Sequence, residues 1–83
     1  MELLDYQKVT KLTWRALEKQ IGVKHSNLNA IAHGRRDCSQ KTARAIEDKT
    51  SGAVTANDLN KARRRFLEEE AKRYAASQSE ARA

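Results

Sequence analysis

The amino-acid sequence predicts an all-α fold: one small, compact domain of five helices, with a last helix that extends beyond it. Three observations indicate this. The 83 residues include no proline and only three glycines, so little in the chain interrupts a helix. Apolar residues recur at helical spacing, and no stretch alternates apolar and polar residues as a strand does. Hydrophobic residues make up 39% of the chain and aromatic residues 5%, which suits one small aliphatic core.

Two short helices are expected at the start of the chain. Leu3, Leu4 and Val9 fit a first helix over residues 2–8. Thr13 has the side chain of an N-cap, and Gly22 can adopt the positive φ that ends a helix, so a second helix is expected between them. The apolar positions of this second helix have helical spacing: Ala16, Leu17 and Ile21.

A third helix is expected over His25–Ala32, directly after the turn at Gly22. Leu28 and Ile31 form its inner face, and Gly34 ends it. Because the turn is short, the second and third helices are expected to cross steeply, which leaves the outer face of the third helix prominent. A helix of this size fits the major groove of DNA.

Two further helices complete the predicted domain. Ser39 is the expected cap of a fourth helix, which ends before residues 50–52, and Val54 then enters the core. Thr55 is the expected cap of the last helix, over residues 56–75. Its apolar residues are predicted to form one stripe, which comprises Leu59, Ala62, Phe66, Ala71 and Tyr74.

Composition and size limit the classes of function. The net charge of +6 favours an anionic partner, above all nucleic acid, although it could serve solubility alone. A single cysteine cannot form an internal disulfide, and no Cys/His cluster has zinc spacing, so no cofactor or metal is expected. No apolar run suits a bilayer or a signal peptide, which predicts a cytosolic protein without membrane contact. Neither the size nor any nucleophile–base arrangement supports an enzyme.

The outward side chains of the third helix are polar, and none of them is acidic. They are Lys24, His25, Ser26, Asn27, Asn29 and His33. A solvated helix face usually includes Glu or Asp, and acidic groups are repelled by phosphate. Arg35 and Arg36 follow at once, where a loop can contact the DNA backbone. The pattern indicates a helix that reads DNA, and the alternative is a polar solvent face on a structural helix pair.

Two stretches, in the correct order within one short basic chain, carry a family resemblance over Lys11 to Leu59. The first comprises Leu12-Thr13, Leu17, Ile21-Gly22-Val23, Leu28, Ile31 and His33-Gly34-Arg35. The second is residues 45–55, with the sequence AIEDKTSGAVT. Together they resemble the Cro/CI-type (XRE) helix-turn-helix repressors of phages, plasmids and bacteria, and the second stretch resembles the small prophage Cro-like members.

Two positions depart from the family pattern. Glu18 occupies a position near the helix crossing that is usually Ala, so its side chain must either extend outward or widen the crossing. Trp14 occupies a position that is often Gln and that faces phosphate. Its indole can therefore donate to a phosphate oxygen or pack against the core.

The resemblance implies a compact helix-turn-helix domain of the Cro/CI repressor type over residues 1–59. The long helix over residues 55–76 would then serve dimerisation, and the small polar tail, residues 77–83, is expected to be disordered. The implied function is that of a sequence-specific transcriptional regulator, a homodimeric repressor bound to a palindromic double-stranded DNA operator. The implied location is the bacterial cytoplasm, in association with the nucleoid.

Site residues follow from the resemblance position by position. Base readout is assigned to His25, Ser26 and Ala30, and Asn29 can contact either base or backbone. Phosphate contacts are assigned to Lys24, Asn27, Arg35, Arg36, Lys41, Arg44 and, in one of its two roles, Trp14. The expected dimer interface comprises Leu59, Ala62, Phe66 and Tyr74.

Several alternatives remain open at this point. The chain could be an antitoxin-like module that binds a protein partner through its C-terminal helix and also regulates its own operon. It could instead bind nucleic acid without sequence preference. Cys38 reads either as a small residue before a helix cap or as a thiol whose pKa is lowered by Arg35 and Arg36. His25 and His33 are eight residues apart, which is not a metal-ligand spacing.

Overall fold

The computed structural model describes the backbone of residues 1–82 and the side chains of residues 1–77. Within that range the chain forms five α-helices and no strand, which confirms the all-α prediction. Their bounds are Leu3–Thr10 (α1), Trp14–Ile21 (α2), His25–Ala32 (α3), Gln40–Lys49 (α4) and Ala56–Arg82 (α5). None of these helices is both long and apolar enough to cross a bilayer.

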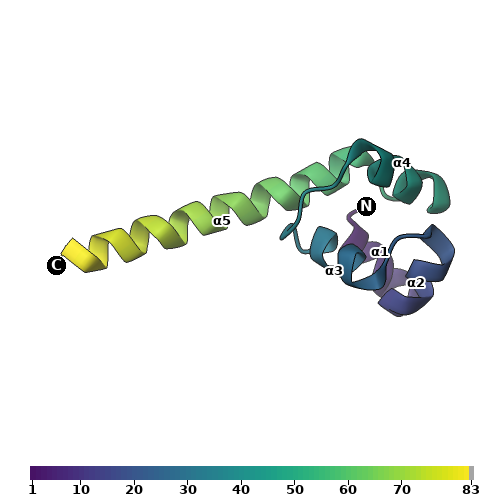
Figure 1. Cartoon of the computed structure of the whole chain (residues 1–83), viewed down its shortest axis with the longest axis horizontal. Helices are drawn as coiled ribbons and strands as arrows, with labels where there is room; N and C mark the ends of the chain where they lie inside the picture. The colour runs from purple at the N-terminus through teal and green to yellow at the C-terminus, as the bar shows by residue number, and fades with distance from the viewer. Residues whose placement is uncertain (83) are drawn as a thin grey trace.

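The helices form a compact body from which the second half of α5 projects (Figure 1). The molecule measures 50 × 22 × 20 Å, and its radius of gyration is 14.9 Å. A compact domain of this length has a radius of gyration of about 12 Å, so the projecting helix accounts for the difference. Side chains from Leu67 to Ser77 are all exposed.

The end of α5 differs from the sequence prediction. The helix was expected to end near residue 75 and to be followed by a disordered tail over residues 77–83, but it continues to Arg82. The expectation is therefore wrong for residues 77–82, because this segment contains Ala, Gln, Glu and Arg and lacks a Gly or Pro that would end a helix. Ala83 lies outside the described residues.

The core is aliphatic, as the composition predicts. Its most buried side chains come from four helices and the loop before α5, and they are Leu3, Leu17, Leu28, Ile46 and Val54. Val54 enters the core as expected. Val9 does not, since its side chain is 68% exposed. It lies six residues after Leu3, about 240° around the helix, and so faces away from the side of α1 that is buried.

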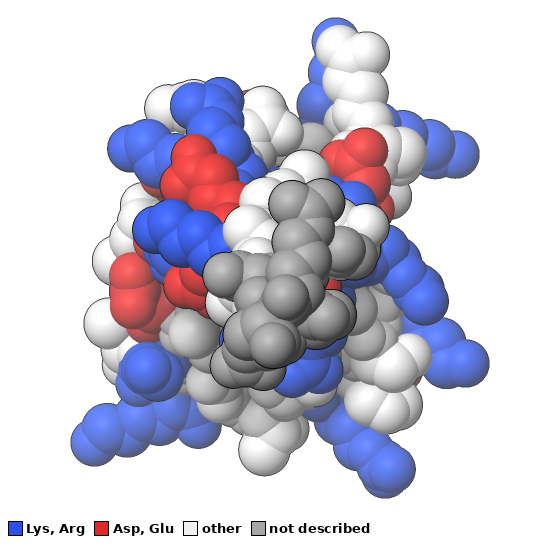
Figure 2. Space-filling model, turned by 90° about the vertical axis from the view of Figure 1, so that its left-hand side faces the viewer, with Lys and Arg blue, Asp and Glu red and all other residues white. Residues whose placement is uncertain are grey.

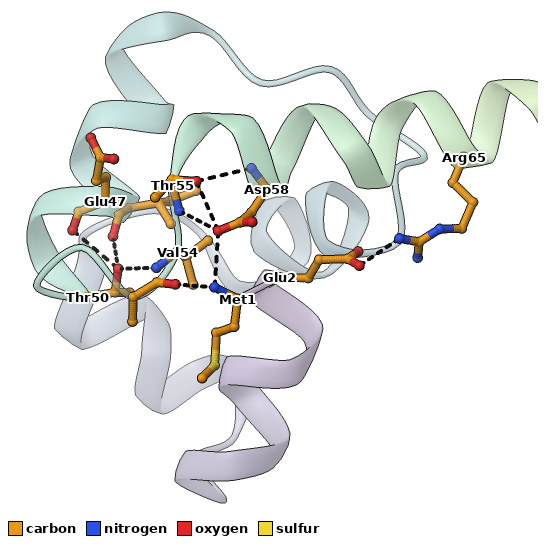
Figure 3. Close-up of polar contacts among 10 residues, drawn as sticks. Met1, Glu2, Glu47, Thr50, Val54, Thr55, Asp58 and Arg65 are labelled. Carbon is orange, nitrogen blue, oxygen red and sulfur yellow. Dashed lines mark hydrogen bonds and ion pairs between the residues drawn. The ribbon is translucent and has the colours of Figure 1, made fainter.

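Side-chain caps fix the starts of α2, α4 and α5 at the predicted residues. Thr13 and Ser39 each accept a hydrogen bond from the backbone N–H three residues later, at 3.1 and 3.2 Å. At α5 the capping is reciprocal (Figure 3): the Asp58 N–H donates to Thr55 Oγ1 at 3.2 Å, and the Thr55 N–H donates to Asp58 Oδ2 at 3.0 Å. Such caps satisfy N–H groups that have no partner within the helix.

Polar contacts attach the first half of α5 and the loop before it to the rest of the body (Figure 3). The Arg65 guanidinium donates to the Glu2 carboxylate at 2.6 Å, and the two residues are 63 positions apart in the sequence. In the preceding loop the buried Thr50 hydroxyl donates to the Ile46 carbonyl at 2.7 Å and accepts the Val54 N–H at 3.2 Å. The Thr50 bonds hold the turn between α4 and α5, so α5 leaves the body in a defined direction.

Candidate nucleic-acid interface

A short connection holds α3 against α2. Gly22 ends α2 with φ 84°, and its N–H donates to the Glu18 carbonyl at 2.7 Å. Residues 22–24 then lead directly into α3. Apolar side chains of the two helices share the core: Leu17, Ile21, Leu28 and Ile31. This packing fixes which face of α3 points outward.

Three of the four residues expected to read bases lie on the accessible side of α3. Successive residues are about 100° apart on a helix, so Ser26 and Ala30 lie nearly opposite the buried Leu28. Ser26 is exposed, and Ala30 and Asn29 are partly exposed. His33 is also exposed, and its Nδ1 lies 3.0 Å from the Asn29 carbonyl oxygen. The helix itself contains no acidic residue.

The fourth of these residues, His25, is bound to Glu18 of α2. One carboxylate oxygen of Glu18 accepts the His25 backbone N–H at 2.6 Å and lies 2.9 Å from His25 Nδ1. Lys24, the N-cap residue of α3, makes no side-chain cap. Glu18 therefore takes over the capping of α3, and of the imidazole nitrogens only Nε2 is left for another partner.

This contact also settles how a long acidic side chain is accommodated near the α2–α3 crossing. The Glu18 side chain lies outward, is 40% exposed, and bridges the two helices. The His25 backbone N–H, followed by the His25 side chain, lowers the pKa of Glu18 below its ordinary value. Sequence reasoning singled out Glu18 but missed its partner. A helix start without a capping side chain was the signal that could have indicated it.

The C-terminal end of α3 presents two arginines. Gly34 has φ 74°, its N–H donates to the Ile31 carbonyl, and the Arg35 N–H donates to the Ala30 carbonyl at 2.9 Å. These two bonds form a Schellman motif, which ends α3 where the sequence predicts. Arg35 and Arg36 are exposed. The Arg36 guanidinium donates to the Asn27 side chain at 3.1 Å, so two of the expected phosphate contacts lie together.

Helix α5 packs directly behind this end of α3. The Arg63 guanidinium donates to the Gly34 carbonyl at 2.9 Å. A Cβ atom at position 34 would collide with the Ala62 carbonyl oxygen and would lie 2.8 Å from the Ala62 carbonyl carbon and 2.9 Å from Phe66 Cβ. Only glycine therefore fits here. Sequence reasoning missed Arg63, because nothing local links residues 29 positions apart.

The remaining residues assigned to phosphate lie elsewhere on the surface. Lys24 is exposed at the start of α3, and Lys41 is exposed on the first turn of α4. Arg44 lines an open hollow together with Glu47 and Asp48, whose carboxylates would repel a phosphate there. Trp14 is half-buried and packs against the core, which is one of the two roles expected of it.

The residues assigned to a dimer interface are divided between two environments. Leu59 and Ala62 are only 4% and 6% exposed because they pack inside their own domain, so their assignment to a dimer interface is wrong. Phe66 is half-buried beside Gly34, and Tyr74 is exposed. The predicted single stripe is also wrong. The apolar residues of the projecting part lie about 110° around the helix from those that face the core.

On the face of the molecule seen along α5, charge alone does not mark one side. Lys and Arg side chains project around much of the outline, and Asp and Glu side chains lie on the left side and at the upper right (Figure 2). Among the described residues, no three His, Cys, Asp or Glu side chains could hold a metal ion together. The feature that distinguishes α3 is that its outward side chains are mostly polar and include no acidic residue.

Cys38 is a half-buried residue that packs against the core. Burial raises the pKa of its thiol above the ordinary value, and the neighbouring Asp37 raises it further. The alternative in which Arg35 and Arg36 lower this pKa is therefore wrong. The thiol serves packing just before the cap of α4.

Comparisons of this chain with protein-family models, with curated proteins and with solved structures found no match. Any function assigned to the chain therefore depends on its own residues and on how they are arranged.

Proposed function

We propose that the protein is a sequence-specific transcriptional regulator, a homodimeric repressor that inserts α3 into the major groove of a palindromic operator. The observation that carries this proposal is the outward face of α3. It carries no acidic side chain and has the small side chains of Ser26 and Ala30 at its centre. It is bounded by Lys24 at one end and Arg35 at the other. The resemblance to Cro/CI-type repressors supports the same function.

The central side chains of α3 suit base readout. The Ser26 hydroxyl can donate to or accept from a base edge, and the Asn29 amide can do both at once. The Ala30 methyl group fits against the methyl group of thymine. His25 contributes Nε2 in an orientation fixed by Glu18, because the opposite ring nitrogen is already engaged. Such a mixture of donors, acceptors and apolar surface distinguishes one base pair from another.

The basic side chains around this face suit phosphate contacts, which supply affinity and position without sequence information. Arg36 is held beside α3 by Asn27, so its guanidinium loses less conformational freedom on binding. Arg35 is exposed next to it, on a loop supported from behind by α5 through Arg63. Each phosphate neutralised releases counterions, so the affinity should fall as the salt concentration rises.

Two substitutions separate these roles on an operator recovered by selection. Arg35→Ala should weaken binding to operator and to random DNA alike and reduce the salt slope by about one. Ser26→Ala should lose about 1–3 kcal/mol on the operator only, at one or two base pairs, with random DNA unaffected. Fluorescence anisotropy with labelled duplexes at several salt concentrations measures both effects.

Lys49→Ala is the matched control for the lost charge. Lys49 is exposed at the far end of α4, nine residues, or about 14 Å along the helix, from its first residue beside the arginine loop. Its substitution should leave the salt slope unchanged. An equal loss on operator and random DNA for Ser26→Ala would contradict base readout by α3, and binding without any sequence preference would contradict the proposed function as a whole.

A further inference from the structure

The projecting part of α5 carries an exposed apolar seam. Leu67, Ala71 and Tyr74 are spaced by four and three residues, so they lie within about 60° of one another around the helix. All three are exposed, Leu67 at 49% and Tyr74 at 68%. The same chain does not cover this seam, because its body packs on a different side of α5, around Ala62 and Phe66.

The charges beside this seam are complementary to those of a second, antiparallel copy. Glu68 and Glu70 flank the first half of the seam. Lys72 and Arg73 follow in the second half on the same two flanks, about 130° around the helix from the centre of the seam, so only their long side chains can reach a partner. A two-fold axis beside Ala71 would place Leu67 of one chain level with Tyr74 of the other. Glu68 would then lie within about 2 Å, along the axis, of the level of Lys72 in the other chain, and Glu70 within about 3 Å of that of Arg73, on the matching flanks.

A parallel arrangement lacks this complementarity, since its two-fold axis brings opposite flanks of the two helices together and places Glu68 of one chain within about 3 Å, along the axis, of the level of Glu70 of the other. Ala71 at the centre of the antiparallel arrangement is small, which permits close approach of the two helices. Within one chain Arg73 already lies 3.4 Å from Glu70, and an antiparallel copy brings a second arginine to the same carboxylate. The charge order Glu-Glu-Glu-Ala-Lys-Arg therefore favours self-association in one direction only.

We propose that the seam of α5 binds a second copy of this chain, antiparallel and centred on Ala71. This inference specifies how the dimer of the proposed function forms, and the role of that dimer in binding DNA rests on the proposed function. In such a dimer the two Gly34 contacts, near residue 64 of each α5, are separated by about 21 Å along the helices. Each α3 lies beyond its contact, on the side away from the C-terminus (Figure 1). The separation between the two α3 helices is therefore larger than that between the contacts, and it approaches the length of one turn of DNA.

Disulfide trapping tests the direction and the centre of the contact. In a Cys38→Ser background, Ala71→Cys should oxidise to a covalent dimer, because the two positions meet at the axis. Leu67→Cys and Tyr74→Cys should not, since each is separated from its own copy by about 10 Å along the axis, which exceeds the span of a disulfide. Equal trapping at all three positions indicates a parallel pair and overturns the proposal, as does trapping at none of them.

Charge exchange tests the flanking pairs in solution without DNA. By sedimentation equilibrium, Glu68→Lys and Lys72→Glu should each weaken dimerisation about tenfold, because two attractive pairs become repulsive. The double variant should restore dimerisation, and far-UV circular dichroism controls for helix content. A double variant as weak as the single ones overturns the proposal, as does a wild-type chain that stays monomeric. Since no DNA is present, these failures bear on the dimer, and they are distinct from a loss of sequence preference in DNA binding, which bears on base readout by α3.

Discussion

The contact between Gly34 and α5 makes the strongest prediction about the stability of the domain. At this position glycine meets two separate demands, a positive φ of 74° and a backbone approach that leaves no room for a Cβ atom. The atoms that a Cβ would meet include the carbonyl of Ala62, which belongs to the helix backbone and cannot rotate away. Gly34→Ala therefore forces either α5 or the end of α3 to move.

The expected loss follows from three contributions. An alanine in the left-handed region costs about 1 kcal/mol relative to glycine. Overpacking against the helix backbone costs about 1–3 kcal/mol. If α5 shifts, the Arg63 bond to the Gly34 carbonyl is lost, which costs about 1 kcal/mol more. The sum is about 3–5 kcal/mol, a large fraction of the stability of a domain of this size, which is about 4–12 kcal/mol.

Urea unfolding followed by the fluorescence of Trp14, the only tryptophan, measures this loss. Gly22→Ala and Gly52→Ala are matched controls, because both glycines have a positive φ, 84° and 81°, with nothing within 4 Å of a Cβ atom. Each control should lose only about 1 kcal/mol. If Gly34→Ala destabilised the domain no more than the controls do, the close packing of α5 behind α3 would be refuted.

Three further substitutions test other parts of the structure. Ser51 has φ 55° at the end of α4, so Ser51→Gly should stabilise the domain by about 1 kcal/mol in urea unfolding, and a loss of stability would contradict this backbone conformation. The lowered pKa of Glu18 means that its bonds to His25 stabilise the fold above the ordinary carboxyl pKa and are lost as the pH falls through the lower, folded pKa. The difference in unfolding free energy between the wild type and Glu18→Gln should therefore be constant at neutral pH and shrink as the pH falls below the ordinary carboxyl pKa. A difference independent of pH would show that the carboxylate charge is not involved. Thr50→Val should cost about 1–3 kcal/mol of unfolding free energy because it leaves the buried Val54 N–H without a partner. Thr50→Ser keeps the hydroxyl and should retain most of this stability. Equal losses for the two variants would argue against the hydrogen bond between Val54 and Thr50.

The local elements of the fold could be predicted from the sequence because their signals are local. Thr13, Ser39 and Thr55 have capping side chains, and Gly22 and Gly34 supply positive φ, so the starts of α2, α4 and α5 and the ends of α2 and α3 follow from residues within a few positions. The end of α5 could not be placed in this way. Its last residues were judged by their small, polar composition, which fits a helix as well as it fits a disordered tail.

Contacts between distant segments were beyond the reach of sequence patterns. The stripe along α5 was assumed to be continuous, but the helix changes the face it uses where it leaves the body. The core therefore takes Leu59 and Ala62, and a different side carries Tyr74. The bridge from Glu18 to His25 likewise depends on how α2 and α3 are positioned. For the candidate site, the outward face of α3 was predicted, whereas its support from α2 and α5 was not.

Selection from randomised duplex DNA at physiological salt, with the purified protein, tests the central claim most directly. Sequence-specific readout by paired α3 helices predicts recovery of one inverted repeat, with half-site centres about one helical turn apart, or about 34 Å. Recovery of sequences no different from the unselected pool would contradict base readout by α3.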